Sequence, residues 1–176
     1  MPDNADDREV KRLRSLEKLG ALDTPPDPAL ERICRLVELV FSCETVLVSL
    51  VDDSRQWFKR KSGAVAVDET PREWSFCTHA IQEEGILEVI DALIDPVFKE
   101  SPLVTGPPRI RYYAGAPIKL SDGTLPGTLC LIDLKPRTPL ADHERVMLSE
   151  FAGLVGRELE LNRALRTALA QMGAVP

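Results

Sequence analysis

The sequence predicts an α/β fold of the α+β type, in which one antiparallel sheet of five to six strands carries helices on one face and a long excursion on the other. Three observations predict it: amphipathic segments at both ends, two pairs of strand-like segments, and the stretch 62–110 between the pairs. A chain of 176 residues suits one domain. We expect that domain to cover 8–171, with flexible ends at 1–7 and 172–176.

Two helices are predicted before the first strand. An apolar residue recurs at every third position over 10–19, which predicts an amphipathic helix that ends near Gly20. Asp27 followed by Pro28 is typical of a helix start, because aspartate caps the first turn and proline fits its first position. An apolar stripe then continues to Phe41, so the second helix is expected to end there.

Four strands are predicted in two hairpins. The segment 45–51 is rich in β-branched residues and ends in a polar turn, after which 55–61 forms the second strand. The segments 111–120 and 125–134 flank the Asp-Gly pair at 122–123, which is typical of a type I′ hairpin turn. Simple pairing of these segments gives an antiparallel sheet with both faces at least partly covered.

The stretch 62–110 is too long for a bare connection, so we expect it to carry structure of its own. Its composition predicts a short helix over 76–84 and a short strand over 87–90. The breakers at 95–96 and 106–108 leave room for one helical turn between them. An excursion of this kind folds over the sheet and is expected to enclose a cavity.

A long C-terminal helix is predicted from Thr138 and Pro139, another cap followed by proline. The apolar residues along it have roughly heptad spacing: Met147, Phe151, Leu154, Leu161 and Leu165. Such a helix is longer than a small domain needs. We therefore expect its far end, together with the first helix, to form a homodimer or to bind a signalling partner.

Composition and charge exclude several classes of partner. The net charge is −6 and no basic cluster is present, so no nucleic-acid partner is predicted. No apolar run approaches the ~20 residues of a membrane helix, and the acidic N-terminus is unlike a secretory signal. We expect a cytoplasmic protein without a membrane partner. The four scattered cysteines indicate reduced thiols rather than disulfides or a zinc site.

Three segments together resemble one known family. They are Ser75–Ile81 (SFCTHAI), Arg111–Ile118 (RYYAGAPI) and Gly127–Asp133 (GTLCLID), and 95–104 is similar to the segment that usually precedes the second of them. The chain resembles the GAF domain, the small-molecule-sensing module of bacterial signalling proteins, in the subgroup found with histidine kinases and diguanylate cyclases. The resemblance covers about 16–161 and implies sensing and dimeric signalling, with no particular ligand.

Candidate ligand-binding residues lie in and around the excursion. They are Trp74, Phe76, Cys77, His79, Asp91, Arg111 and Tyr113. The aromatic residues suit a ligand pocket and equally suit a core. Arg111 is able to anchor an anion or to form a structural ion pair with Asp91 or Asp95.

No metal site or catalytic residue is predicted, and the sequence identifies no particular cofactor. Thr78 separates Cys77 from His79, whereas the bilin-carrying GAF domains have the two residues adjacent, so packing of Cys77 is the simpler interpretation. Asparagine occurs only at Asn4 and Asn162, so the asparagine-containing signature of cyclic-nucleotide-binding GAF domains is absent. His143 lies in a polar helical turn and is expected to be solvated, and Asp133 is expected to cap a turn.

The function predicted from the sequence is that of a stand-alone sensory or regulatory domain. It would bind an unidentified small molecule and act through a homodimer or a partner protein, because the GAF-like segment leaves no room in this chain for an output domain. Two alternatives stay open. One is a small thiol-dependent enzyme using Cys77, similar to the GAF-fold reductases of free methionine sulfoxide, and the other is a dimerisation module without a ligand.

Overall fold

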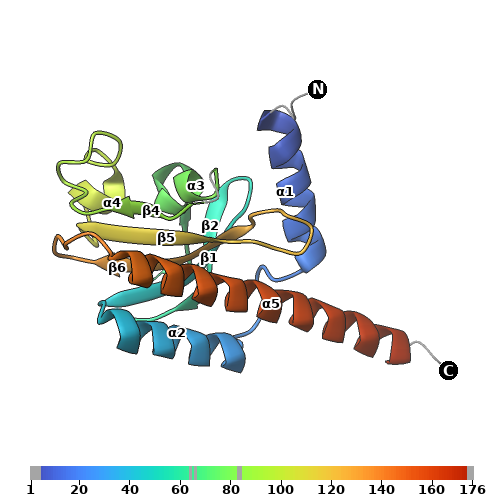
Figure 1. Cartoon of the computed structure of the whole chain (residues 1–176). Coiled ribbons are helices and arrows are strands. Elements are labelled where there is room, and N and C mark those ends of the chain that lie inside the picture. The colour runs from blue at the N-terminus through green and yellow to red at the C-terminus, as the bar shows by residue number, and fades with distance from the viewer. Residues whose placement is uncertain (1–4, 64, 66, 83–84, 174–176) are drawn as a thin grey trace.

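An antiparallel six-stranded sheet in the order β3-β2-β1-β6-β5-β4 organises the molecule (Figure 1). A computed structural model describes residues 5–63, 65, 67–82 and 85–173. The α+β class and the strand number predicted from the sequence are confirmed. The strands are β1 (Thr45–Val51), β2 (Arg55–Lys61), β3 (Glu69–Pro71), β4 (Leu87–Val89), β5 (Tyr112–Ile118) and β6 (Gly127–Asp133).

The two predicted hairpins meet at the centre of the sheet, where β1 pairs with β6. Thr45 lies opposite Ile132 and Leu50 lies opposite Gly127 in this pair. Gly127 is required there, since a Cβ atom at this position would lie 1.9 Å from the Ser49 carbonyl oxygen. Residues far apart in the chain therefore form the middle of the sheet.

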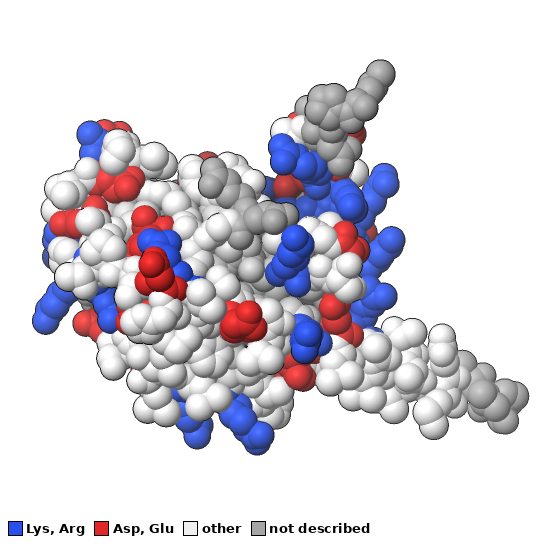
Figure 2. Space-filling view, viewed as in Figure 1, with Lys and Arg blue, Asp and Glu red and all other residues white. Residues whose placement is uncertain are grey.

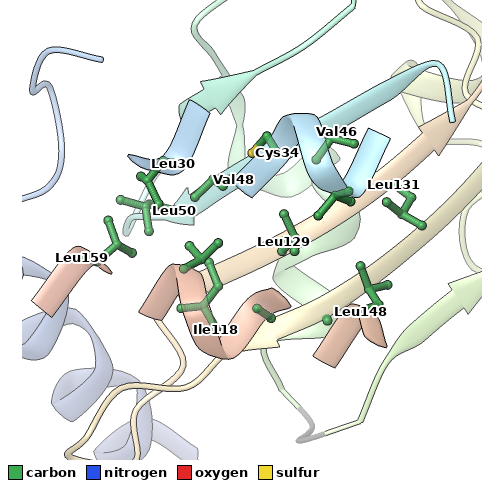
Figure 3. Close-up of a cluster of buried hydrophobic side chains, with 14 of the residues drawn as sticks. Leu30, Cys34, Val46, Val48, Leu50, Ile118, Leu129, Leu131, Leu148 and Leu159 are labelled. Carbon is green, nitrogen blue, oxygen red and sulfur yellow. The ribbon is translucent and has the colours of Figure 1, made fainter. Parts of the chain in front are cut away.

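One face of the sheet is covered by α2 (Pro28–Phe41) and α5 (Asp142–Gly173), which lie side by side in Figure 1. Asp27 caps α2 as predicted, since its Oδ1 accepts hydrogen bonds from the backbone N–H groups of Ala29 and Leu30. The apolar side chains of both helices pack on alternate residues of β1, β5 and β6 (Figure 3). Together they form the first hydrophobic core, whose labelled members in Figure 3 include Leu30, Cys34, Val46, Val48, Ile118, Leu129 and Leu148.

The first helix, α1 (Ala5–Leu19), stands at one end of the sheet beside the β5–β6 loop and contributes only its last turn to this core (Figure 1). Leu16 and Leu19 are each 1% exposed. The helix starts at Ala5, inside the segment 1–7 for which a flexible end was predicted, and residues 1–4 lie outside the described residues. The predicted end near Gly20 is confirmed, because Gly20 has φ = 59° and follows the last helical residue.

The excursion covers the opposite face of the sheet, as predicted. It contains the 3-10 turn Arg72–Trp74, the short helices α3 (Phe76–Ala80) and α4 (Pro102–Thr105), and the strand β4. α3 is shorter than the predicted helix 76–84, of which residues 83–84 lie outside the described residues. The apolar side chains of the excursion form a second core with Leu47, Val51, Phe58 and Cys130 of the sheet.

Two predictions are wrong, one about a turn and one about the start of a helix. Residues 119–126 separate β5 from β6, and of the Asp122–Gly123 pair only Gly123 has a positive φ, 82°, so no type I′ turn forms. The physical reason is a contact with α1: the Ser15 hydroxyl donates to Asp122 Oδ2 at 2.7 Å, and the buried Thr124 hydroxyl lies 2.9 Å from Ser15 Oγ. These contacts hold a longer loop against the helix.

The second wrong prediction concerns the start of α5, which lies at Asp142 and not at Thr138. Leu140 is buried, and its backbone N–H donates to the Glu88 carboxylate at 2.7 Å. The backbone N–H of Ala141 donates to Glu144 Oε2 at 2.8 Å and so supplies the helix cap. None of the helices in the described part of the chain has an apolar stretch long enough to cross a bilayer. The predicted flexible tail 172–176 falls on Met172 and Gly173, which end α5, and on residues outside the described part.

Candidate functional site

An aromatic stack fills the space between the sheet and the excursion. The Phe76 ring lies 4.2 Å from the Phe98 ring at an interplanar angle of 13°, and 5.0 Å from the Tyr113 ring at 30°. All three side chains are 5% exposed or less. Of the candidate ligand residues, the structure brings together Phe76, Cys77 and Tyr113 at this place, where their side chains touch one another rather than line an open space.

Beneath the stack lies a buried cluster of thiols and hydroxyls. The Tyr113 hydroxyl donates to Cys77 Sγ at 3.3 Å, and the Thr128 hydroxyl donates to the same sulfur at 3.0 Å. The Cys130 thiol is a further hydrogen-bonding neighbour of Cys77. We call these residues, Cys77, Tyr113, Thr128 and Cys130, the thiol cluster.

The thiol cluster favours ionisation of Cys77. Burial of this side chain opposes its ionisation, but the hydrogen bonds from Cys130, Thr128 and Tyr113 outweigh that effect and lower the pKa of the Cys77 thiol to about 6. The pKa of Cys130 rises well above its usual value, first because of its interaction with the neighbouring Cys77 thiol and then because it is buried; its thiol donates to the Leu47 carbonyl oxygen at 3.7 Å. The two thiols therefore titrate as a pair, and Cys77 loses its proton first.

Ser49 is a further polar side chain beside the cluster. It is fully buried on β1, and its hydroxyl makes no hydrogen bond of normal geometry within the described residues. It lies close enough to Cys77 to favour the thiolate. A buried hydroxyl without a full partner is unusual in a folded domain and marks this region as more polar than an ordinary core.

Two candidate residues on the excursion lie outside this cluster. His79 is exposed and meets only the edge of the Phe98 ring, at 5.0 Å. Cys77 is 2% exposed, so the two side chains, two positions apart, do not share one face of α3. Trp74 is half-buried beside the second core, and its carbonyl oxygen accepts a hydrogen bond from Ser101 at 3.4 Å.

The remaining two candidate residues pair with each other. Arg111 donates to both carboxylate oxygens of Asp91, at 2.9 Å and 2.8 Å, which is the ion pair that the sequence suggested. Hydrogen bonding within the pair lowers the pKa of Asp91 and raises that of Arg111. Asp95 takes no part, because its Oδ1 accepts the backbone N–H groups of Val97 and Phe98.

Sequence reasoning missed Phe98, Thr128 and Cys130 as members of the site. A usable signal existed for the last two. Thr128 and Cys130 are two positions apart on β6, so they lie on one face, which is the face that Tyr113 occupies on β5. Phe98 had no such signal, since it belongs to an irregular segment whose path depends on tertiary packing. The cysteines are all free thiols, and no group of three or more metal-ligating side chains occurs among the described residues.

Of two expectations about single residues, the exposure of His143 is confirmed, whereas Asp133 does not cap the turn that follows it. His143 is exposed in the first turn of α5. Asp133 closes the end of β6, because it accepts the backbone N–H of Glu44 at 2.6 Å and the Arg137 guanidinium at 2.8 Å. Both contacts join segments of the fold.

Solved structures share this fold. The GAF domain of a phosphoenolpyruvate-protein phosphotransferase from Coxiella burnetii superposes with a TM-score of 0.66 over 93% of this chain and 99% of its own, at 18% identity. A free methionine-R-sulfoxide reductase from Neisseria meningitidis superposes with a TM-score of 0.63 over 92% of this chain and 95% of its own, also at 18% identity. These likenesses concern the fold alone.

Sequence comparison is more specific. A cyclic di-GMP phosphodiesterase of Pseudomonas aeruginosa is 42% identical over 147 residues, which is 84% of this chain and 25% of that protein. The chain therefore spans about a quarter of this relative's length. The family model described as the GAF domain matches residues 25–159, which include every strand and most of the helical face. This chain belongs to the GAF domain family.

Proposed function

We propose that this domain is a regulatory sensor of bacterial signalling that acts as a homodimer through α5. The observation that carries the proposal is the apolar seam of α5, formed by Leu154, Leu161, Leu165, Ala168 and Met172. Successive members are spaced by seven, four, three and four residues, which places them at the a and d positions of heptads. Met147 and Phe151 extend the same seam toward the N-terminal end of the helix.

The seam is exposed where α5 leaves the domain. The buried residues of α5 are Leu148, Ala152, Val155, Gly156 and Leu159, and Met147 and Phe151 are partly buried against the same core. Beyond them the helix runs on to Gly173, an overhang of roughly 20 Å at 1.5 Å per residue. Leu161 is 62% exposed, Leu165 55% and Met172 73%. Figure 2 shows this overhang with almost no charged side chains on the visible side.

A parallel pair of α5 helices would remove this surface from water. Large apolar side chains repeated along one helical stripe destabilise a monomer in solution and match the seam of a two-stranded coiled coil. A second copy of the same chain presents the same stripe, so a twofold axis along α5 satisfies both copies. Dimeric helices of this kind pass a change in packing from a sensory core to whatever follows them.

A chain of contacts links the excursion to α5. Tyr113 belongs to the aromatic stack, and its neighbour Tyr112 points to the opposite face, where its hydroxyl donates to Glu88 at 3.0 Å. The Glu88 carboxylate is 5% exposed and also pairs with Arg145 of α5. We propose that a small molecule entering under the excursion displaces the aromatic stack and shifts α5 through these contacts.

The relative named as a cyclic di-GMP phosphodiesterase indicates the kind of output. We propose that the matching quarter of that protein is its sensory part, and that this domain likewise regulates cyclic di-GMP turnover. Catalysis by Cys77 is the weaker alternative, because the thiol is 2% exposed beneath the aromatic stack, where a substrate does not reach it.

The dimer is tested by sedimentation equilibrium of three proteins at micromolar concentration. The wild type is expected to be dimeric, and Leu161→Asp is expected to be monomeric because a carboxylate at a d position opposes its symmetry mate. Thr167→Asp adds the same charge at an exposed position off the seam and should stay dimeric. A monomeric wild type, or equal dissociation by both variants, would refute the proposal.

A further inference from the structure

A cavity with several charged side chains lies on the helical side of the molecule, away from the excursion. Its volume is about 250 Å³, and it is bordered by the α1–α2 connection, the start of α2, β2 and α5. Five polar side chains line it, and four of them carry a charge or an amide: Asp27, Lys59, Asn162 and Arg166, beside the Thr24 hydroxyl. It lies where α5 leaves the domain, since Leu159 is the last buried residue of that helix.

Two of these side chains are cations without a carboxylate partner. Lys59 Nζ donates to the Thr24 hydroxyl at 2.6 Å and to the Pro25 carbonyl at 2.7 Å. Arg166 Nη2 donates to the carbonyls of Leu19 and Gly20, at 2.7 Å and 3.1 Å. All four acceptors are neutral, and neither cation lies within ion-pair distance of a carboxylate in the described part of the chain.

The carboxylate that shares the cavity is already engaged. Asp27 Oδ1 accepts two backbone N–H groups at the start of α2, and Oδ2 accepts the Asn162 amide at 2.5 Å. The positive end of the α2 dipole offsets its charge further. Burial lowers the pKa of Lys59, and the nearby Arg166 charge lowers it too, although Asp27 acts in the other direction. Asp27 thus acts on the ammonium through its charge without forming an ion pair with it.

We propose that this cavity binds the phosphate group of a small molecule between Lys59 and Arg166. Both cations have unused donors in the described structure. One N–H of the Lys59 ammonium makes no hydrogen bond, and neither do the Nη1 and Nε groups of Arg166. The two negative charges of a phosphate dianion balance two cations that have no carboxylate partner, and its oxygens accept hydrogen bonds from both. The cavity is large enough for the phosphate and a few further atoms.

The position of the site gives such binding a consequence for α5. Lys59 belongs to β2, whereas Arg166 belongs to the overhanging part of α5. A phosphate held by both side chains fastens the overhang to the sheet and to the α1–α2 connection. This site is separate from the aromatic stack, so phosphate binding does not depend on a ligand under the excursion.

Calorimetric titration with inorganic phosphate at pH 7.5 and constant ionic strength tests the site. The wild type is expected to bind one phosphate per chain saturably, and Arg166→Gln and Lys59→Met are each expected to weaken binding by roughly tenfold or more. Arg163→Gln removes the same charge from an exposed position of the same helix and should change the affinity less than about twofold. Circular dichroism of each variant verifies that it is folded.

Three outcomes would overturn the proposal. The first is a wild type that binds no phosphate, and the second is equal weakening by Arg166→Gln and Arg163→Gln, which would indicate general charge attraction. The third is acetate binding as tightly as phosphate, which would refute selectivity for a dianion. Because Arg166 is exposed on the overhanging part of α5, its variant still tests the site if Lys59→Met fails to fold.

Discussion

At the scale of single residues, Gly115 shapes the aromatic stack. The Tyr113 ring lies over this glycine, which is two positions further along β5. A Cβ atom added at Gly115 would lie 2.1 Å from the Tyr113 hydroxyl oxygen and 2.6 Å from Tyr113 Cζ. Both residues face the excursion because they are two positions apart on one strand. The glycine therefore allows the tyrosine to reach Cys77.

Gly115→Ala is expected to destabilise the domain by roughly 1–3 kcal/mol, because the ring must leave its place in a filled core. Gly153→Ala is the matched control, since a Cβ at that exposed helical position meets nothing within 4 Å. It should stabilise α5 by about 0.5–1 kcal/mol. Urea denaturation measures both changes, and a loss of stability in both variants would contradict this account.

Cys77 is expected to ionise in the native protein near pH 6, because hydrogen bonds from three neighbours outweigh its burial. A pH titration of thiolate absorbance should show this transition in the wild type and not in Cys77→Ser. Cys34 and Cys43 do not interfere, because burial raises the pKa of each to about 12.

Thr128→Val removes one donor at nearly constant volume and should move the transition to higher pH. A wild type without a thiolate signal below about pH 8 would show that burial dominates instead.

At the scale of elements, α1 is held to the sheet by one ionic network. Arg12 is 5% exposed; it donates to the Val51 carbonyl oxygen at 2.5 Å and pairs with Glu9 at 2.7 Å. Arg72 of the excursion pairs with the same Glu9, also at 2.7 Å. The helix thus contacts both the sheet and the excursion through side chains near its middle.

Hydrogen bonding to Arg12 and then to Arg72 lowers the pKa of Glu9 from 4.5 to about 2, against the effect of partial burial. Since the folded pKa is below the unfolded one, the stabilisation is present above about pH 4.5 and is lost as the pH falls toward 2. At pH 7, Glu9→Gln should cost roughly 1 kcal/mol, because Glu9 is partly exposed and solvent weakens its ion pairs.

Urea denaturation at pH 7 and pH 3 measures the difference between wild type and Glu9→Gln, which should shrink by more than half at the lower pH. Glu17→Gln, on the exposed side of the same helix, is expected to have little effect at either pH. An unchanged difference at pH 3 would contradict the assignment of the pKa shift.

The elements also show how far sequence patterns reach. Local signals predicted α2, β1 and β2 well, because a cap, a periodic stripe and a polar turn are written within a few neighbouring residues. The start of α5 and the β5–β6 turn were predicted wrongly, because Glu88 and Ser15, distant in the chain, decide them. The candidate site was predicted in part for the same reason: α3 and β5 carry recognisable segments, whereas Phe98 and the Lys59–Arg166 pair meet only in the folded protein.

At the scale of the whole molecule, the sheet separates two cores with different contents. The core under α2 and α5 is mainly aliphatic, with Phe41, Trp57 and Tyr112 among its members, whereas the core under the excursion holds the aromatic stack and the thiol cluster. A GAF domain with this division has one face that supports the fold and one face that is chemically distinctive. The proposed phosphate site is a third region of possible function. It lies on the helical side, where the α5 overhang meets the α1–α2 connection and β2.

The pairing of β1 with β6 determines when the domain is able to fold during its synthesis. Residues 45–51 remain without one of their two neighbouring strands until residues 127–133 have been made. Contacts between such distant segments slow folding and leave the apolar β1 unprotected in the growing chain. The sheet therefore stays incomplete until residues 127–133 have left the ribosome, and during that time β1 is exposed to aggregation.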